Sequence, residues 1–96
     1  MATWDERKRL RNIKDHGWDL AGADLIWDRF TVTREDVRKR YEENRYVTFG
    51  LLEGQVVVLV HTDRDGEMHV ISLRKAEPYE ARYYLEAAKE YLGEKD

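Results

Sequence analysis

The chain has 96 residues, which predicts one domain over residues 1–96 with a small hydrophobic core. Its 17 basic and 20 acidic residues nearly balance, so a chain-wide basic field for nucleic acid is excluded and any RNA or DNA site must be a local patch. The lack of cysteine excludes disulfides, thiolate metal sites and a cysteine nucleophile and fits a cytoplasmic location, while no apolar run approaches the roughly 20 residues that span a bilayer.

Two helices are expected in the first third of the chain, after a short edge strand at residues 2–4. The first helix covers residues 5–15 and ends before Gly17, because a glycine there can adopt the left-handed conformation that stops a helix. The second covers residues 19–28, where apolar positions recur at three and seven residues. The connection between them is short, so the two helices should pack as an αα-hairpin.

One stripe of the first helix should carry four different functional groups, because their positions are separated by three, four and four residues. They are an acceptor, a cation, an amide and an imidazole: Asp5, Lys8, Asn12 and His16. Leu10 and Ile13 point elsewhere and are expected to be buried. Taken alone, the same stretch is also typical of a solvated helix with ordinary surface charges.

The sequence takes on the period of β-strands after residue 29. Residues 30–33 predict a short strand, and the highly charged residues 34–44 predict a loop or a helical turn. From Arg45 the residues alternate as in a strand, with Val47 and Phe49 on the same face.

The second half of the chain predicts two β-hairpins and a last helix. Residues 55–62 form an unbroken apolar run, which is typical of a central strand covered on both faces. A tight turn precedes this strand, a loop over residues 63–66 follows it, and residues 68–74 return as a strand. Pro78 opens an amphipathic C-terminal helix. The order predicts an α+β fold with two N-terminal helices, an antiparallel sheet of about four strands and a C-terminal helix.

The three histidines, His16, His61 and His69, are the first candidates for chemistry. No pair has the spacing of metal ligands on one helix and no cysteine supports them, so we expect no metal site. His61 is either a proton-transfer group or a structural histidine that is hydrogen-bonded at a strand end. Because antiparallel neighbours place the start of one strand beside the end of the next, Arg45 and His61 should lie at the same end of the sheet and Arg74 towards the opposite end.

Basic residues interleaved with aromatic residues suit the phosphates and stacked bases of RNA. They occur in three groups along the chain: Arg7 to Lys14, Arg34 to Arg40, and Arg74 to Arg82. The alternative is a charged solvent face that carries nearly as many acids.

The stretch from Trp4 to Gly17 follows the pattern W-D-x-x-K-x-x-x-N-x-x-x-H-G, which resembles the start of the BrnT toxins. Later segments resemble the same family in the same order. These are residues 25–28, 43–50, 58–62 and 70–76, followed by Glu80, Arg82 and Tyr84 at the opening of the last helix. The order and spacing of the segments together make the resemblance specific.

The resemblance implies a RelE-like fold and a ribosome-independent RNA endonuclease toxin of a type II toxin-antitoxin system. It also implies a BrnA-type antitoxin as the neutralising partner and a toxin homodimer within a 2:2 complex. The sequence departs from the family pattern at Asp15, where a basic residue is usual and where Lys14 is the nearest substitute, and at Leu73, which replaces a small residue.

RNA cleavage of this type uses the 2′-hydroxyl of the substrate as the nucleophile and requires neither a metal ion nor another cofactor. We expect Arg45 and Arg74 to stabilise the negative charge of the transition state and His16 or His61 to transfer protons. Glu43 is expected to act as a base or to orient Arg45.

RNA binding is expected from four further side chains: Lys8, Asn12, Lys14 and Lys75. The competing hypothesis is a catalytically degenerate interaction module that binds an antitoxin or nucleic acid without cleavage.

Overall fold

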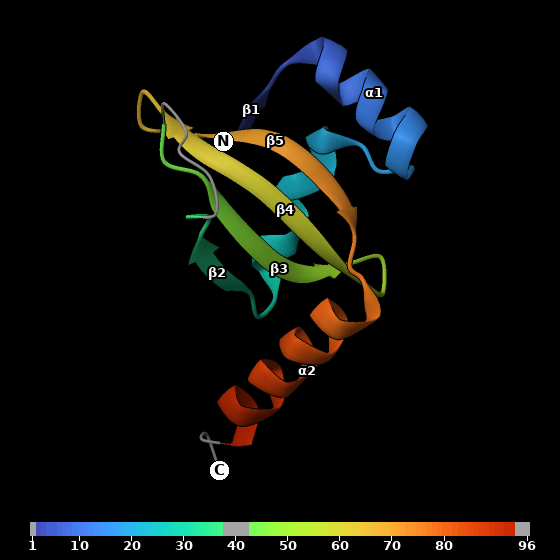
Figure 1. Ribbon diagram of the computed structural model, residues 1–96, viewed down its shortest axis with the longest axis vertical. Coiled ribbons are helices and arrows are strands. Elements are labelled where there is room, and N and C mark those ends of the chain that lie inside the picture. The colour runs from blue at the N-terminus through green and yellow to red at the C-terminus, as the bar shows by residue number, and fades with distance from the viewer. Residues whose placement is uncertain (1, 38–42, 94–96) are drawn as a thin grey trace.

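A computed structural model of the protein describes residues 2–37 and 43–93. Within these residues, five strands form one sheet in the order β1-β5-β4-β3-β2 (Figure 1). The strands are β1 (Ala2–Trp4), β2 (Val32–Glu35), β3 (Tyr46–Leu52), β4 (Gln55–Arg64) and β5 (Glu67–Lys75). The apolar run of β4 occupies the central position, as the sequence predicts.

The sheet is mixed, so the prediction of about four antiparallel strands is wrong in two respects. β1 joins the edge of the sheet and pairs with β5 in parallel, from Ala2 opposite Met68 to Trp4 opposite Val70. The other three strand pairs are antiparallel. The parallel pair brings together segments far apart in the chain, and a local pattern of apolar residues carries no information about such a pairing.

The strand bounds around β2 and β4 also differ from the predicted ones. The strand expected at residues 30–33 lies instead at Val32–Glu35, where it pairs with β3. Residues 38–42 of the predicted loop or helical turn lie outside the described residues. The two central residues of each hairpin turn, Glu53-Gly54 and Asp65-Gly66, have positive φ angles, so β4 continues to Arg64 and the second loop is shorter than expected.

The first helix is confirmed, with its predicted caps. The side chain of Asp5 accepts hydrogen bonds from the backbone N–H groups of Arg7 and Lys8 at the start of α1 (Glu6–His16), and Gly17 ends the helix at a φ of 75°. Leu10 and Ile13, however, are exposed on α1, and Asn12 is buried. The expectation that the two apolar side chains are buried is therefore wrong.

The second predicted helix is a 3₁₀-helix, η1 (Leu20–Asp28), and not an α-helix. Its buried residues Leu20, Ala23 and Ile26 are three positions apart, which is the period of a 3₁₀-helix and places them on one side. This side packs on β1, β3 and β5, and η1 also contacts α1. The two helices are thus in contact, as the predicted hairpin requires, while most contacts of η1 are with the sheet.

The sheet has two different faces, which we call the η1 face and the α2 face. On the η1 face, Val57 and Leu59 pack in one core cluster with the buried side of η1, which lies behind the sheet in Figure 1. On the α2 face, Val58 packs with Tyr84 of α2 (Pro78–Gly93), whose hydroxyl donates a hydrogen bond to the carbonyl of Phe30. In Figure 1, α2 extends away from one end of the sheet. Across the described residues, no helix is long and apolar enough to cross a bilayer.

Candidate nucleic-acid interface

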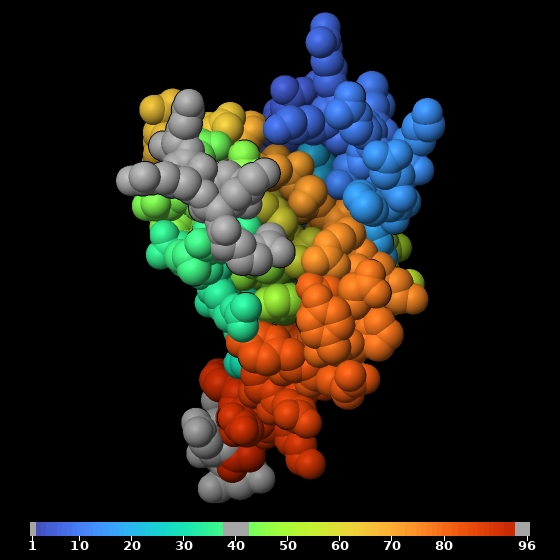
Figure 2. Space-filling model, in the orientation of Figure 1, coloured from blue at the N-terminus to red at the C-terminus, as the bar shows by residue number. Residues whose placement is uncertain are grey.

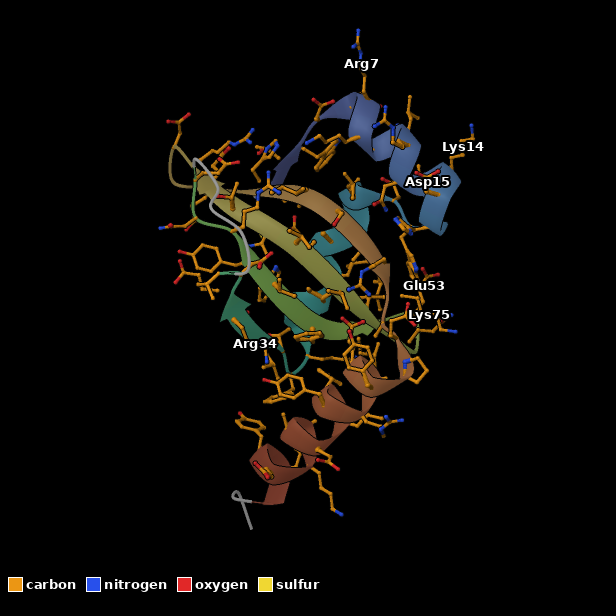
Figure 3. The ribbon with its side chains drawn as sticks, in the orientation of Figure 1. Arg7, Lys14, Asp15, Arg34, Glu53 and Lys75 are labelled. Carbon is orange, nitrogen blue, oxygen red and sulfur yellow. The ribbon has the colours of Figure 1, made fainter. Side chains whose placement is uncertain are left out.

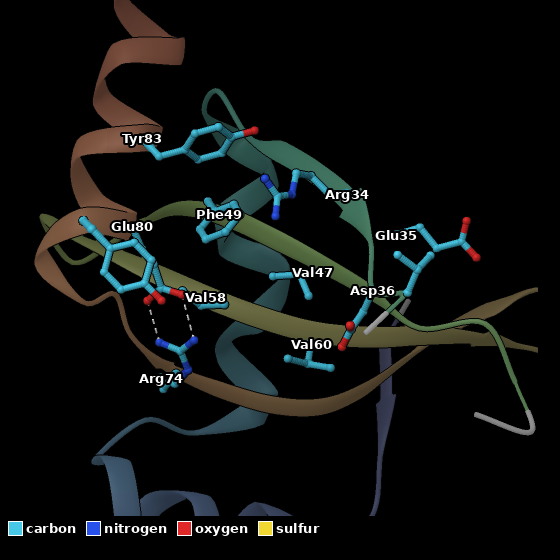
Figure 4. A pocket seen from close by; sticks show the side chains of 12 residues that line it. Arg34, Glu35, Asp36, Val47, Phe49, Val58, Val60, Arg74, Glu80 and Tyr83 are labelled. Carbon is cyan, nitrogen blue, oxygen red and sulfur yellow. Dashed lines mark hydrogen bonds and ion pairs between the residues drawn. The ribbon is translucent and has the colours of Figure 1, made fainter. Parts of the chain in front are cut away.

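A cavity of about 420 Å³ lies on the α2 face, between β2, the centre of the sheet and the start of α2 (Figure 4). Its floor is apolar and consists of Val47, Phe49, Val58 and Val60. Its rim consists of Val37 and of two basic, three acidic and two aromatic side chains: Arg34, Arg74, Glu35, Asp36, Glu80, Tyr79 and Tyr83. In the space-filling view, atoms of the central strands are visible at the surface between α1 and α2 (Figure 2).

Arg34 and Tyr83 combine a cation with an aromatic ring at the rim of this cavity. The guanidinium carbon of Arg34 lies 5.4 Å from the centre of the Tyr83 ring, and the same ring packs edge-on against Phe49 with their centres 5.4 Å apart. The two residues come from β2 and α2, so only the tertiary fold joins them. A guanidinium beside an exposed ring suits a phosphate and an adjacent stacked base.

On the other side of the cavity, Arg74 forms an ion pair with Glu80. Its two terminal nitrogens donate to the two carboxylate oxygens of Glu80 at 2.8 and 2.9 Å (Figure 4). Glu80 also accepts a hydrogen bond from the backbone N–H of Glu77, at the start of α2. The hydrogen bonds from Glu80 raise the pKa of Arg74 above its ordinary value. The pair therefore ties the end of β5 to α2.

The opposite end of the α2 face carries His69. Val58, Val60 and Thr62 alternate along β4 onto this face, and Thr62 pairs with His69, so the two paired side chains lie on the same face. The hydroxyl of Thr3 forms a hydrogen bond of 2.8 Å with Nδ1 of His69. Arg74 pairs with Val58 and His69 with Thr62. These two β4 partners are four residues apart, so Arg74 and His69 are separated by about 13 Å along the sheet.

An ion pair lies next to His69. Arg64 donates from two nitrogens to the carboxylate of Glu43 at 2.9 and 3.1 Å, which lowers the pKa of Glu43. The charges of Arg45 and His69 also act on Glu43, although more weakly. The structure therefore pairs Glu43 with Arg64, whereas the sequence suggested Arg45 as its partner.

His61 lies on the η1 face, away from the cavity. It is 7% exposed, its Nε2 forms a hydrogen bond of 2.7 Å with the hydroxyl of Thr48, and the Trp27 ring packs edge-on against it. Burial lowers its pKa. This arrangement agrees with the structural alternative for His61. The register also confirms the predicted ends of the sheet, because Tyr46, next to Arg45, pairs with His61 while Arg74 pairs with Val58 further along.

His16 lies in a separate hollow of about 470 Å³ at the end of α1. Lys75 and Glu53 line the same hollow and lie beside each other in Figure 3. Lys14 projects away from the sheet in the same view. The structure thus brings His16 and Lys75 together, but it does not bring them to the cavity that Arg74 lines.

The buried side chain of Asn12 forms hydrogen bonds with backbone groups of the fold. Its side-chain nitrogen donates to the carbonyls of Trp18 and Leu73, and its oxygen accepts from the backbone N–H of Leu73. The side chain is 6% exposed. Its amide is therefore occupied by the backbone of Trp18 and Leu73 and is not open to RNA in this structure.

Four residues of the α2 face were absent from the predicted site: Arg34, Arg64, His69 and Tyr83. A signal existed for Arg34, which belongs to the second basic group, but its strand was placed two residues too early. For His69 the available signal is its residue type and its place in the strand that pairs with the one carrying His61. In the part of the chain that the structure describes, no group of three or more His, Cys, Asp or Glu side chains is arranged to hold a metal ion.

Comparison with known families gives one result that covers most of the chain. Residues 4–80 match the model of the family described as the ribonuclease toxin BrnT of type II toxin-antitoxin systems. No curated protein matches the sequence. The matched range contains α1, η1, the strands β2 to β5, the last residue of β1 and the Arg74–Glu80 pair. The chain belongs to the BrnT family of ribonuclease toxins.

Proposed function

We propose that the protein is an RNA endonuclease that binds a single RNA strand along the α2 face. Family membership supports ribonuclease activity, an RNA target and an antitoxin partner. The observation that carries the placement is the Arg34–Tyr83 pair at the rim of the apolar cavity, because a cation beside a ring suits both parts of a nucleotide.

The proposed reaction is attack of the 2′-hydroxyl on the adjacent phosphorus, which releases the 5′-oxygen and leaves a 2′,3′-cyclic phosphate. The protein must orient the hydroxyl, accept its proton and stabilise the charge on the phosphate oxygens. Arginines supply the charge because they stay protonated and bind phosphate with two donors. Arg34 and Arg74 lie at one end of the face and Arg64 at the other, so the two groups would contact different phosphates of the strand. Arg74 and Arg64 would do so with the N–H groups that remain beside their ion pairs with Glu80 and Glu43.

The proposed partner is a BrnA-type antitoxin, with the toxin as a homodimer within a 2:2 complex. Exposed apolar side chains around the cavity, among them Val37 and Tyr79, provide contact area for such a protein. An antitoxin bound there would exclude RNA from the cavity. We propose a cytoplasmic location as well, since the RNA target and the antitoxin would both be met there.

The test incubates antitoxin-free protein with RNA and analyses the new ends. Cyclic phosphate ends that disappear when the antitoxin is added are the expected result, and a light-scattering mass of the complex reports the 2:2 composition. Alanine variants of His16, Arg45, His61 and Arg74, each checked for folding, then rank the sequence-derived candidates. If none of the four variants cleaves more slowly than the wild type, those four assignments are wrong.

One observation favours the second candidate function, an interaction module without catalysis. Arg74 is held by Glu80, and neither His16 nor His61 lies on the α2 face. Such a protein binds RNA or antitoxin but produces no new RNA ends. The same incubation, followed by a binding measurement with the uncleaved RNA, separates the two functions.

A further inference from the structure

His69 lies on the α2 face, where the RNA strand is proposed to bind. Its pairing with Thr62 places it on the face that carries the cavity, and its side chain is only partly buried. His61 is buried on the other face, and His16 lines the hollow at the end of α1. Of the three histidines in the sequence, His69 is therefore the one on the α2 face.

Thr3 fixes the imidazole of His69. β1 pairs with β5 so that Thr3 lies opposite His69, and the hydroxyl is 2.8 Å from Nδ1. In the tautomer with the proton on Nδ1, that N–H donates to the threonine oxygen and Nε2 presents its lone pair. Because a hydroxyl can both donate and accept, this contact orients the ring in either tautomer, and in the Nδ1-protonated one Nε2 is the nitrogen that can take a proton.

Charged groups from three elements act on the imidazole. They are Arg64 of β4, Glu43 before β3, and Lys8 and Asp5 at the start of α1. Burial and the Arg64 charge lower the pKa of His69, Lys8 adds to this effect, and the two carboxylates oppose it. The ring is consequently neutral near pH 7, which is the form that a general base needs.

We propose that His69 is the general base of RNA cleavage and that Arg64 and Lys8 bind the phosphate beside it. The inference rests on the proposed ribonuclease function and adds the residue that starts the reaction. Nε2 takes the 2′-hydroxyl proton while the 2′-oxygen forms a bond to phosphorus and the bond from phosphorus to the 5′-oxygen breaks. Water protonates the departing 5′-oxygen, and the imidazolium neutralises the hydroxide that remains.

The experiment compares single-turnover cleavage by wild-type protein, His69→Asn and His69→Ala. We expect both variants to cleave about 10²- to 10⁴-fold more slowly, which is the usual contribution of a general base. The affinity for a 2′-O-methyl RNA, which cannot react, should change less than threefold in His69→Asn. Added imidazole should restore part of the rate of His69→Ala but leave the wild-type rate unchanged, a result that a purely structural role would not give.

The pH profile and a matched pair of lysine variants complete the test. The wild-type rate should fall as the pH drops through the pKa of His69, and this limb should be missing from the residual rate of His69→Asn. Lys8→Gln should weaken RNA binding, whereas Lys89→Gln, an exposed cation on α2, should not. Thermal unfolding monitored by circular dichroism verifies that each variant is folded.

The outcomes separate the two proposals. A wild-type protein that cleaves and a folded His69→Asn that cleaves within threefold of it overturn the role of His69 alone. If His16→Asn loses the low-pH limb of the rate profile and His69→Asn keeps it, the base is His16. This outcome also overturns the role of His69 alone. A wild-type protein that yields no cyclic ends overturns the ribonuclease function and this inference together.

Discussion

The side-chain amide of Asn12 and the backbone of Leu73 form two hydrogen bonds, from Nδ2 to the carbonyl oxygen at 2.7 Å and from the Leu73 N–H to Oδ1 at 3.2 Å. β1 pairs with β5 only as far as Trp4 opposite Val70, so the chain leaves the sheet before it reaches Leu73. Asn12 returns from α1 and provides the donor and the acceptor that a longer β1 would have provided. This contact fixes α1 on the edge of the sheet.

Replacement of Asn12 by alanine should therefore destabilise the fold. The buried N–H and carbonyl of Leu73 would lose their partners, which is expected to lower the free energy of unfolding by about 2–4 kcal/mol. Urea unfolding followed by tryptophan fluorescence measures the change. Leu10→Ala is the matched control on the same helix, because an exposed side chain should alter stability by less than about 0.5 kcal/mol. Equal effects of the two substitutions would contradict the role of Asn12.

Gly50 of β3 allows η1 to lie close to the sheet. A Cβ at this position would be 3.1 Å from Cβ of Ile26 and 3.3 Å from Cγ2 of Thr31, so these neighbours would have to move. We expect Gly50→Ala to cost about 1–3 kcal/mol of stability, as overpacking does in other cores. Gly22→Ala in η1 meets no atom within 4 Å and is the control. Calorimetric melting should show a lower Tm for the first variant only.

The stability of the protein should fall as the pH decreases below about 6.5. Burial lowers the pKa of His61, so the folded state stays neutral at pH values where the unfolded chain already binds a proton. Stability from this group is complete above the unfolded pKa and is lost through the window below it, by up to about 1.4 kcal/mol per pH unit. His69, whose pKa is also lowered by burial, contributes with the same sign.

Urea unfolding at several pH values between about 5.5 and 8 tests this expectation, a range around the ordinary histidine pKa. His69→Asn removes one contribution, and the slope that remains belongs to His61. His61→Gln, which keeps a hydrogen-bonding group for the Thr48 hydroxyl, should reduce that remaining slope. A slope that persists unchanged in the double variant would mean that other groups produce it.

RNA binding should depend on Arg34 and on salt. If its guanidinium contacts a phosphate beside the Tyr83 ring, Arg34→Gln should weaken binding of a 2′-O-methyl RNA and reduce the slope of log K against log salt by about 0.7. Fluorescence anisotropy at several salt concentrations measures both quantities. Arg7→Gln is the control, because Arg7 projects away from the sheet in Figure 3. The same slope in wild type and Arg34→Gln would remove Arg34 from the interface.

Local sequence rules were enough for the elements that local interactions define. Asp5 and Gly17 cap α1 as predicted, because caps depend on groups within a few residues. The apolar run of β4 indicated a strand with both faces covered, and Pro78 marked the first residue of α2. Residue pattern and order together also indicated the BrnT family, which the family match confirms.

The structure brings only some residues of the predicted site together, because the prediction combined side chains that lie in different parts of the fold. A helical stripe groups Lys8, Asn12 and His16 by their spacing. The sheet edge buries Asn12, and the end of α1 sets His16 beside Lys75. Spacing along a helix tells which side chains are neighbours, but it does not tell which side of the helix the rest of the fold will cover.

The sequence by itself determined the helix caps, the central strand, the hairpins and the family. Only the tertiary structure decided that β1 pairs in parallel with β5, and with this pairing that Thr3 meets His69. The same applies to Arg34 and Tyr83, which approach because β2 and the start of α2 flank one cavity. The physical reason is that caps and turns are stabilised by neighbours in the chain, whereas the face a strand residue occupies depends on register with a distant partner.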